Sequence, residues 1–216
     1  MSKFITKIGM PMLAVLLLAG NLWAATLTAS PVVYNVTVSQ VRVYNSDLST
    51  WYVAGSGDLT FDIASVTAGS VVANYVSGAN LSEGTYTQVE VTLSRTMSVK
   101  AQVTDAGGVF GGGAGVTYYT TSTTTSGAVS CSTAAGSYNT GSTRIPDAVA
   151  SSLPATETLS GNYLIHLDTL PNIIVKKGGT KSVKVNFNTT NVVTFENVGV
   201  GTVICYPGPP TVTITQ

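Results

Sequence analysis

The chain contains little charge. Charged side chains make up 9% of its 216 residues, and the ten basic groups balance the ten acidic ones. A protein that binds nucleic acid needs a basic patch to neutralise phosphates, so this composition argues against nucleic acid as a partner. A quarter of the residues are Ser or Thr. Few Lys and Glu together with many hydroxyls favour an extracellular β protein over one with long solvent-facing helices.

Sequence patterns of known catalytic and metal sites are also missing. The glycines at 107–115 lack the spacing of a phosphate-binding loop and precede no helical pattern. The single histidine, His166, lies two residues before Asp168 on an expected strand, but the chain has no nucleophile elbow. A histidine on a strand surface is the favoured interpretation. We therefore expect a protein that is not an enzyme, with no catalytic residues, no cofactor and no metal.

Cysteine is scarce, since Cys131 and Cys205 are the only two. They do not form a C-x-x-C motif, and one histidine with two cysteines is a poor zinc set. An exported protein with one cysteine pair is expected to form a disulfide. On the chain-entropy model such a long-range bridge stabilises the fold by roughly 4 kcal/mol.

The chain has one notable hydrophobic run, Met10–Ala19, which is too short to span a bilayer. Two lysines precede it, and the small residues Gly20, Ala24 and Ala25 close the segment, in the three-part layout of a secretory signal peptide. No cysteine stands at Asn21, where a lipoprotein signal needs one. We expect cleavage after residue 24, no membrane anchor in the mature chain, and passage through a periplasm to the cell surface or the medium. Residues 25–216 would then form a single domain.

Apolar residues recur with period two, as in half-buried strands. The phase changes between Val38 and Val41, which predicts a β-bulge or a strand that passes between sheets. Alternation continues from Val89 to Val103, which indicates either one long strand or two strands bent near Arg95. Other alternating segments lie at 59–63, 163–167, 183–187 and 212–214. The pattern predicts an all-β fold, an antiparallel Greek-key β-sandwich.

Residues 105–162 have a different composition. Glycines and a run of hydroxyl side chains leave few apolar groups there. We expect a long, low-complexity insertion between two strands, which is flexible unless the predicted disulfide holds it.

The segment Leu81-Ser82-Glu83-Gly84-Thr85-Tyr86-Thr87-Gln88-Val89 resembles the signature L-x-x-G-x-Y-T-Q-[IV] of an exported bacterial and archaeal β-sandwich family of unknown function. That family is often grouped with transthyretin-like and Ig-like folds. The resemblance covers most of residues 26–104 and 163–216 and leaves the insertion out. It implies the fold and export, and no activity. In physical terms, Gly84 permits a tight turn, and Tyr86 packs its ring while its hydroxyl caps nearby backbone, as in a tyrosine corner.

Two hypotheses for the function remain. The first is a non-enzymatic structural or adhesive surface protein, a fibre or pilus-like subunit that adds a strand to its neighbour's sheet. The second is a module that binds glycans or other surface ligands through exposed aromatic rings. The candidate rings are Trp51, Tyr52, Tyr118 and Tyr119, although Trp51 and Tyr52 can equally begin a strand and cap the core. Expected partners are therefore copies of this chain, surface glycans or surface proteins.

Overall fold

The computed structural model is built almost wholly of antiparallel strands, with one short 3-10 turn, η1 (Ala135–Ser137). None of its helices is of a length and hydropathy that could cross a membrane, within the part of the chain described. The predicted signal peptide lies outside that part. The structure describes residues 25–65, 81–125, 127–145, 153, 155–176, 184–199, 201–208 and 210–215.

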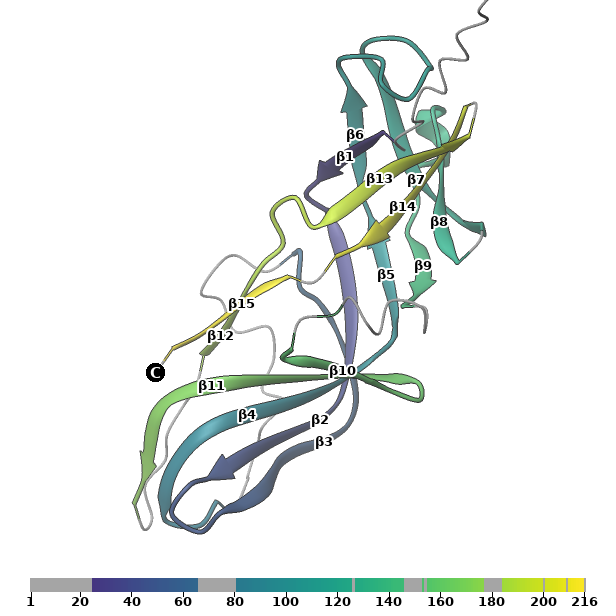
Figure 1. Ribbon diagram of the computed structural model, residues 1–216. Coiled ribbons are helices and arrows are strands. Elements are labelled where there is room, and N and C mark those ends of the chain that lie inside the picture. Colours follow the sequence, from purple (N-terminus) through teal and green to yellow (C-terminus); the bar gives the residue numbers. More distant parts are fainter. Residues whose placement is uncertain are drawn as a thin grey trace, which may run out of the picture.

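Two large sheets and one two-stranded ribbon make up the fold (Figure 1), which confirms the predicted all-β, sandwich-like class. The six-stranded sheet has the order β1 (Thr26–Ala29), β13 (Val193–Gly199), β14 (Thr202–Pro207), β8 (Ala128–Ser132), β7 (Val116–Thr125) and β6 (Gln102–Asp105). The seven-stranded sheet has the order β10 (Glu157–Ser160), β11 (Tyr163–Val175), β4 (Gly84–Ser94), β2 (Val33–Asn45), β5 (Thr96–Lys100) and β9 (Gly141–Arg144), and β3 (Thr50–Asp62) pairs with β2. The ribbon joins β12 (Lys184–Asn188) to β15 (Thr211–Thr215).

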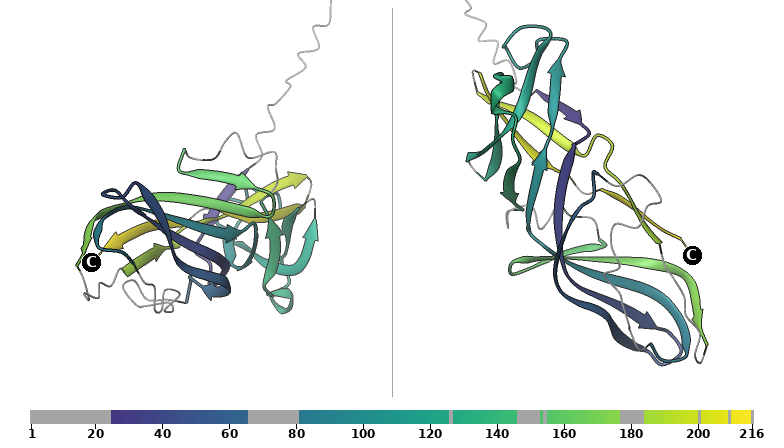
Figure 2. Two further views of the ribbon diagram at one scale, coloured as in Figure 1. Left: turned by 90° about the horizontal axis from the view of Figure 1, so that it is seen from below. Right: turned by 180° about the vertical axis from the view of Figure 1, so that it is seen from behind.

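The molecule is elongated, with two lobes that meet where the long strands cross (Figures 1 and 2). In the lobe that we call the sandwich lobe, the six-stranded sheet packs on β5, β9 and the first half of β2. Buried side chains from both sheets form its core, among them Tyr34, Val36, Val99, Val129, Phe195 and Cys205. In the other, the sheet lobe, β3, β4, β11 and the second half of β2 curl together. Its smaller core contains Tyr86, Val89, Leu170, Ile173 and Val175.

Strand β2 contributes to both cores. Val36 and Val38 are buried, and Val36 belongs to the core of the sandwich lobe, whereas Val41 and Val43 pack on that of the sheet lobe. The pairing of β2 with both β3 and β4 shifts between Val38 and Gln40. The change of phase in the sequence is therefore a bulge, and it marks where β2 leaves one core for the other.

The described part of residues 105–162 does not form the flexible insertion expected from their composition. It supplies β7, β8, β9 and β10, and Phe110, Tyr118 and Val129 are buried in the core of the sandwich lobe. The buried Asp105 carboxylate accepts hydrogen bonds from the backbone N–H groups of Val109 (2.9 Å) and Phe110 (2.7 Å). A few apolar side chains suffice because the largest of them are buried in the core, while backbone hydrogen bonds order the hydroxyl-rich strands around them.

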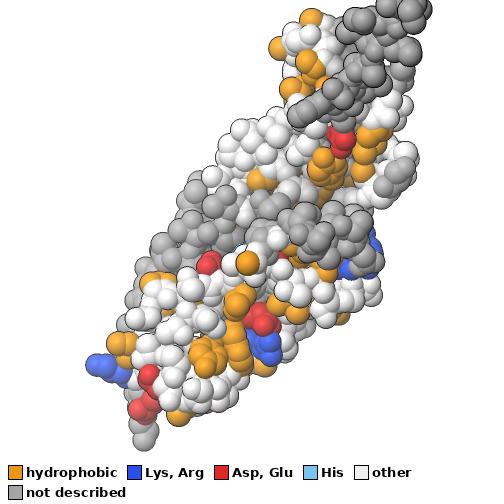
Figure 3. All heavy atoms as spheres, in the orientation of Figure 1, with side chains coloured by type: hydrophobic (Ala, Val, Ile, Leu, Met, Phe, Trp, Pro, Cys, Tyr) orange, Lys and Arg blue, Asp and Glu red, His pale blue; other side chains and the backbone are white. Residues whose placement is uncertain are grey.

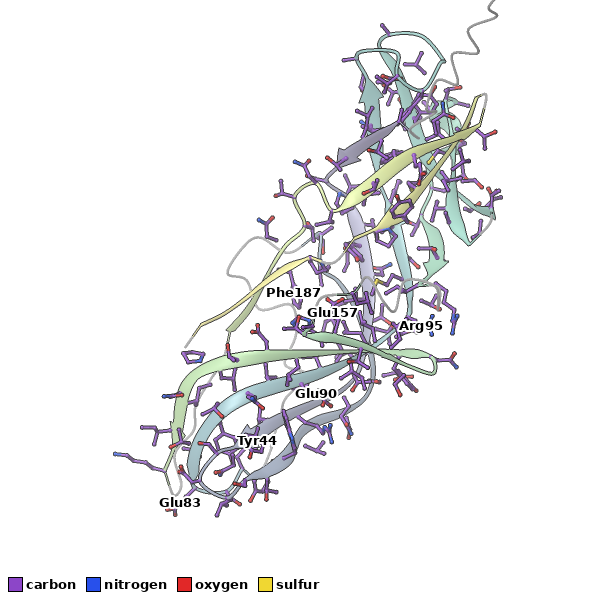
Figure 4. All side chains as sticks on the ribbon, in the orientation of Figure 1. Tyr44, Glu83, Glu90, Arg95, Glu157 and Phe187 are labelled. Atoms are coloured by element: carbon purple, nitrogen blue, oxygen red, sulfur yellow. The ribbon has the colours of Figure 1, made fainter. Side chains whose placement is uncertain are left out.

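Arg95 lies between the end of β4 and the start of β5. The alternating run from Val89 to Val103 therefore forms separate strands with a break at Arg95, which was one of the two alternatives expected from the sequence. The Arg95 side chain is only 1% exposed and lies at the junction of the lobes (Figure 4). The guanidinium donates to the carbonyl oxygens of Ile145 and Gly161 (2.8 Å). The backbone takes part too, since Arg95 N–H donates to Asn162 O and Ile145 N–H donates to Arg95 O, both at 2.9 Å.

Replacing Arg95 with Met should lower the free energy of unfolding by about 3–5 kcal/mol, because a buried side chain that donates to carbonyl oxygens of two other chain segments is lost. Urea unfolding followed by circular dichroism measures the change. Arg144→Met is the matched control, since Arg144 is exposed and its guanidinium contacts are long, at 3.5 Å. Equal stabilities of the two variants would contradict a structural role for Arg95.

The turn before β4 has the geometry inferred from the sequence. Gly84 has φ +143°, and a Cβ there would lie 2.5 Å from Asn45 Nδ2. Asn45 is fully buried and donates to the Glu83 carbonyl oxygen. Tyr86 is 1% exposed, and its hydroxyl donates to Ser82 O at 2.8 Å. The tight turn and the capping tyrosine are thus confirmed.

Gly84→Ala should destabilise the protein by about 3 kcal/mol, because the new methyl group meets Asn45 in a backbone conformation that already strains alanine. Gly113→Ala is the control: its φ of +101° carries the same kind of strain, but its Cβ points into open space. We expect a loss of about 1 kcal/mol there. The difference in thermal or urea unfolding between the variants isolates the contact with Asn45.

Candidate functional site

The aromatic residues predicted for binding fall into different environments. Tyr118 is 3% exposed and packs edge-to-face on Phe110, with ring centroids 5.2 Å apart. Tyr52 is half-buried and packs on Tyr86 in the core of the sheet lobe. Both rings therefore serve as core side chains. Trp51 and Tyr119 are half-buried and belong to neither of the two cores.

Trp51 lies on the face of the sheet lobe opposite its core. Its ring centroid is 5.2 Å from that of Tyr44, its partner across β2 and β3, and 5.3 Å from the Arg42 guanidinium carbon. Arg42 in turn binds Glu90 on β4 by two hydrogen bonds, Nε–Oε1 at 2.8 Å and Nη2–Oε2 at 2.7 Å. The indole is thus held beside an ordered ion pair.

Strand register brings these side chains to one face. Arg42 pairs with Val53 on one side and Glu90 on the other, and Tyr44 pairs with Trp51 and Gln88. We call this set the aromatic patch: Arg42, Tyr44, Trp51, Val53, Gln88 and Glu90. In Figure 3, hydrophobic side chains lie around an adjacent acidic and basic pair in the region where Figure 4 labels Tyr44 and Glu90. Sequence analysis found only Trp51, although Arg42 and Tyr44 alternate with Val41 and Val43 and so had to face away from the core.

Tyr119 belongs to a separate cluster on the six-stranded sheet. Its ring centroid is 5.4 Å from that of Tyr138, and the Lys100 ammonium lies 4.4 Å from the Tyr138 centroid. Burial and the neighbouring Tyr119 raise the pKa of the Tyr138 phenol. The cluster therefore joins β5, β7 and the turn after η1, which is a structural use of these rings.

Most sheet edges of the sandwich lobe are covered. The outer strands β1 and β6 of the six-stranded sheet lie beside each other. Strand β9 reaches across to the opposite sheet, where Thr124 Oγ1 donates to Ser142 O at 2.9 Å. The position of a Gly141 Cβ is filled by Val129, so the two layers are in close contact there.

Strand β3 is an edge of a different kind. It runs for 13 residues at the rim of the sheet lobe (Figure 1) and, within the described part of the chain, pairs with β2 alone. Proteins protect exposed edges with lysine, proline, very short strands or β-bulges. β3 has neither lysine nor proline, its only charged residues are Asp58 and Asp62, and its pairing with β2 shifts register at two places. Val53 is 53% exposed and Leu59 is 41% exposed.

Near Val53, the register shows which backbone N–H groups of β3 point toward β2 and which point away from it. Ser46 N–H donates to Thr85 O at the start of β4. Because successive residues of a central strand bond to opposite neighbours, Val43 bonds toward β3. Val43 pairs with Tyr52, so the N–H of Tyr52 faces β2 and that of Val53 faces outward.

The two residues considered for catalysis make ordinary contacts. His166 Nδ1 lies 3.5 Å from a carboxylate oxygen of Glu157, its partner across β10 and β11. An oxygen of Asp168 accepts a hydrogen bond from the N–H of Thr169 at 2.7 Å. Searched over the described residues, the chain has no group of three His, Cys, Asp or Glu side chains able to hold a metal ion.

The two cysteines are free thiols, so the predicted disulfide is not formed in this structure. They are nevertheless neighbours: Cys131 on β8 packs against the core that contains Cys205 on β14, and these strands pair. A hydrogen bond with Cys131, and then burial, raise the pKa of the Cys205 thiol.

The fold and these surfaces define a class: an all-β, sandwich-like protein with an aromatic sheet face and an edge strand, β3, that pairs with β2 alone among the described strands. Residues 31–199 match the model of a domain of unknown function (DUF4382), and the chain belongs to that family. The match includes residues 105–162, which the resemblance seen in the sequence left out. No curated protein matches the chain, and no solved structure does.

Proposed function

We propose that this protein is a non-enzymatic structural or adhesive component of the cell exterior, which associates with copies of itself by strand addition at β3. The observation that carries the proposal is the edge of β3 over residues 50–56, which pairs with β2 alone among the described strands. Repeated addition would build a fibre or pilus-like assembly.

Strand addition suits this edge for physical reasons. The bonds that join an added strand come from the backbone, so a partner strand needs no special side chains to pair. Charged side chains that would repel or solvate an incoming strand are few in β3. The exposed Val53 and Leu59 would lose contact with water when another strand covers the edge, which favours association.

An exterior location is consistent with the rest of the chain. The predicted signal peptide implies export, and the hydroxyl-rich composition is typical of secreted β proteins. Strong intersheet packing in the sandwich lobe, such as that of Gly141 on Val129, leaves the sheet lobe as the part available to partners. Nothing in this proposal requires chemistry at His166 or Asp168.

Val53→Pro should prevent self-association, because it removes a backbone N–H that faces away from β2 while leaving the β2–β3 bonds intact. Val53→Ala is the control, since it shortens the side chain and keeps the N–H. Light scattering after size exclusion and negative-stain microscopy would compare both with the wild-type chain over a range of concentrations. The proposal fails if the wild-type chain stays monomeric, or if the proline variant assembles equally well.

We also propose that Cys131 and Cys205 become a disulfide outside the cell. Thiol–disulfide exchange with an oxidising disulfide would take two electrons and two protons from the thiols and form the S–S bond between β8 and β14. Bridging should raise the free energy of unfolding by roughly 4 kcal/mol. Intact mass before and after reduction, followed by urea unfolding of both forms, tests this. A chain that keeps both thiols after exposure to oxidised glutathione would contradict it.

A further inference from the structure

The aromatic patch holds a half-buried indole ring beside two ordered charges of opposite sign. Trp51 is held by Tyr44 and Arg42, and the ion pair of Arg42 and Glu90 lies directly next to these rings. The core of the sheet lobe occupies the other face of the same strands. The patch is therefore positioned by three strands, β2, β3 and β4, and not by a loop, which favours a site of fixed geometry.

The hydrogen-bonding groups of the patch are only partly used. A guanidinium has about five N–H donors, and a carboxylate accepts at about four positions. The bidentate contact between Arg42 and Glu90 uses two of each. Donors and acceptors thus remain on neighbouring atoms, and the Gln88 amide adds one more of each type.

The charge of the patch selects among ligands. Arg42 and Glu90 are its only charged residues, so its net charge is zero. An anionic or cationic ligand would have to compete with one member of the pair and leave the other without its partner, which is costly. A neutral polyhydroxyl ligand can donate to Glu90 and accept from Arg42 at once, and leave the ion pair intact.

The indole ring of Trp51 supplies the apolar part of the site. An aromatic face buries an apolar surface of matching size, and aromatic residues are favoured where one part of a contact is apolar and the other wet. A pyranose has such a shape, with C–H groups on its face and hydroxyls around its edge. We infer that the aromatic patch is a binding site for neutral glycans, with Trp51 as the stacking ring and Arg42, Glu90 and Gln88 as the hydroxyl-binding groups.

An array of neutral, anionic and cationic oligosaccharides, followed by calorimetry with the neutral ones that bind, tests this inference on the mature chain. Trp51→Ala should weaken the binding of neutral oligosaccharides at least tenfold. Tyr163→Ala is the control, because Tyr163 is an exposed aromatic residue on β11 outside the patch, and it should bind as the wild type does. Circular dichroism and thermal unfolding would confirm that both variants are folded.

Glu90→Gln provides a second variant that keeps the shape of the patch and gives it a net positive charge. We expect neutral oligosaccharides to bind about fivefold more weakly and anionic ones to gain. The inference is overturned if the wild-type chain binds no neutral oligosaccharide, if it binds only charged ones, or if Trp51→Ala binds as well as the wild type. Binding to a single copy does not depend on self-association, so the proposal for β3 can fail while this one holds.

Discussion

The buried guanidinium of Arg95 is the constraint on which the two lobes depend. Burying a cation is costly unless its donors are satisfied, and here the carbonyls of Ile145 and Gly161 accept from it. These carbonyls come from the residue after β9 and from the turn between β10 and β11. One side chain thus ties together three chain segments at the place where the long strands change cores.

This division explains why the candidate surfaces lie in the sheet lobe. In the sandwich lobe each large sheet covers one face of the other, and its edges approach neighbouring strands. In the sheet lobe the strands have a core on one face, so the opposite face carries Trp51, Tyr44 and the ion pair of Arg42 and Glu90. A sheet with one such face and an edge strand such as β3 offers two different ways to meet a partner.

Much of the fold could be predicted from the sequence because apolar and polar residues alternate with a fixed period in strands. The phase change after Val38 and the possible bend near Arg95 were visible as local departures from that period, although each left two alternatives open. The turn at Gly84 was predicted from the conformational freedom of glycine. Residues 105–162 were misjudged because composition counts apolar residues without showing that Phe110 and Val129 are fully buried. The pairing of Arg42 with Glu90 was missed because it depends on register between β2 and β4, which are far apart in the chain.

The edge of β3 and the aromatic patch, if both act as proposed, would reinforce each other. A site built on one indole ring and a few hydroxyl contacts binds weakly, since each such contact contributes little after desolvation. Trp51 and Val53 belong to β3 itself, so an assembly that extends the sheet at β3 repeats the patch at a fixed spacing. A surface with many equivalent sites retains a polymeric glycan far better than one copy does, because each further contact forms at high effective concentration. Self-association would then be the means by which a weak glycan site becomes an adhesive surface.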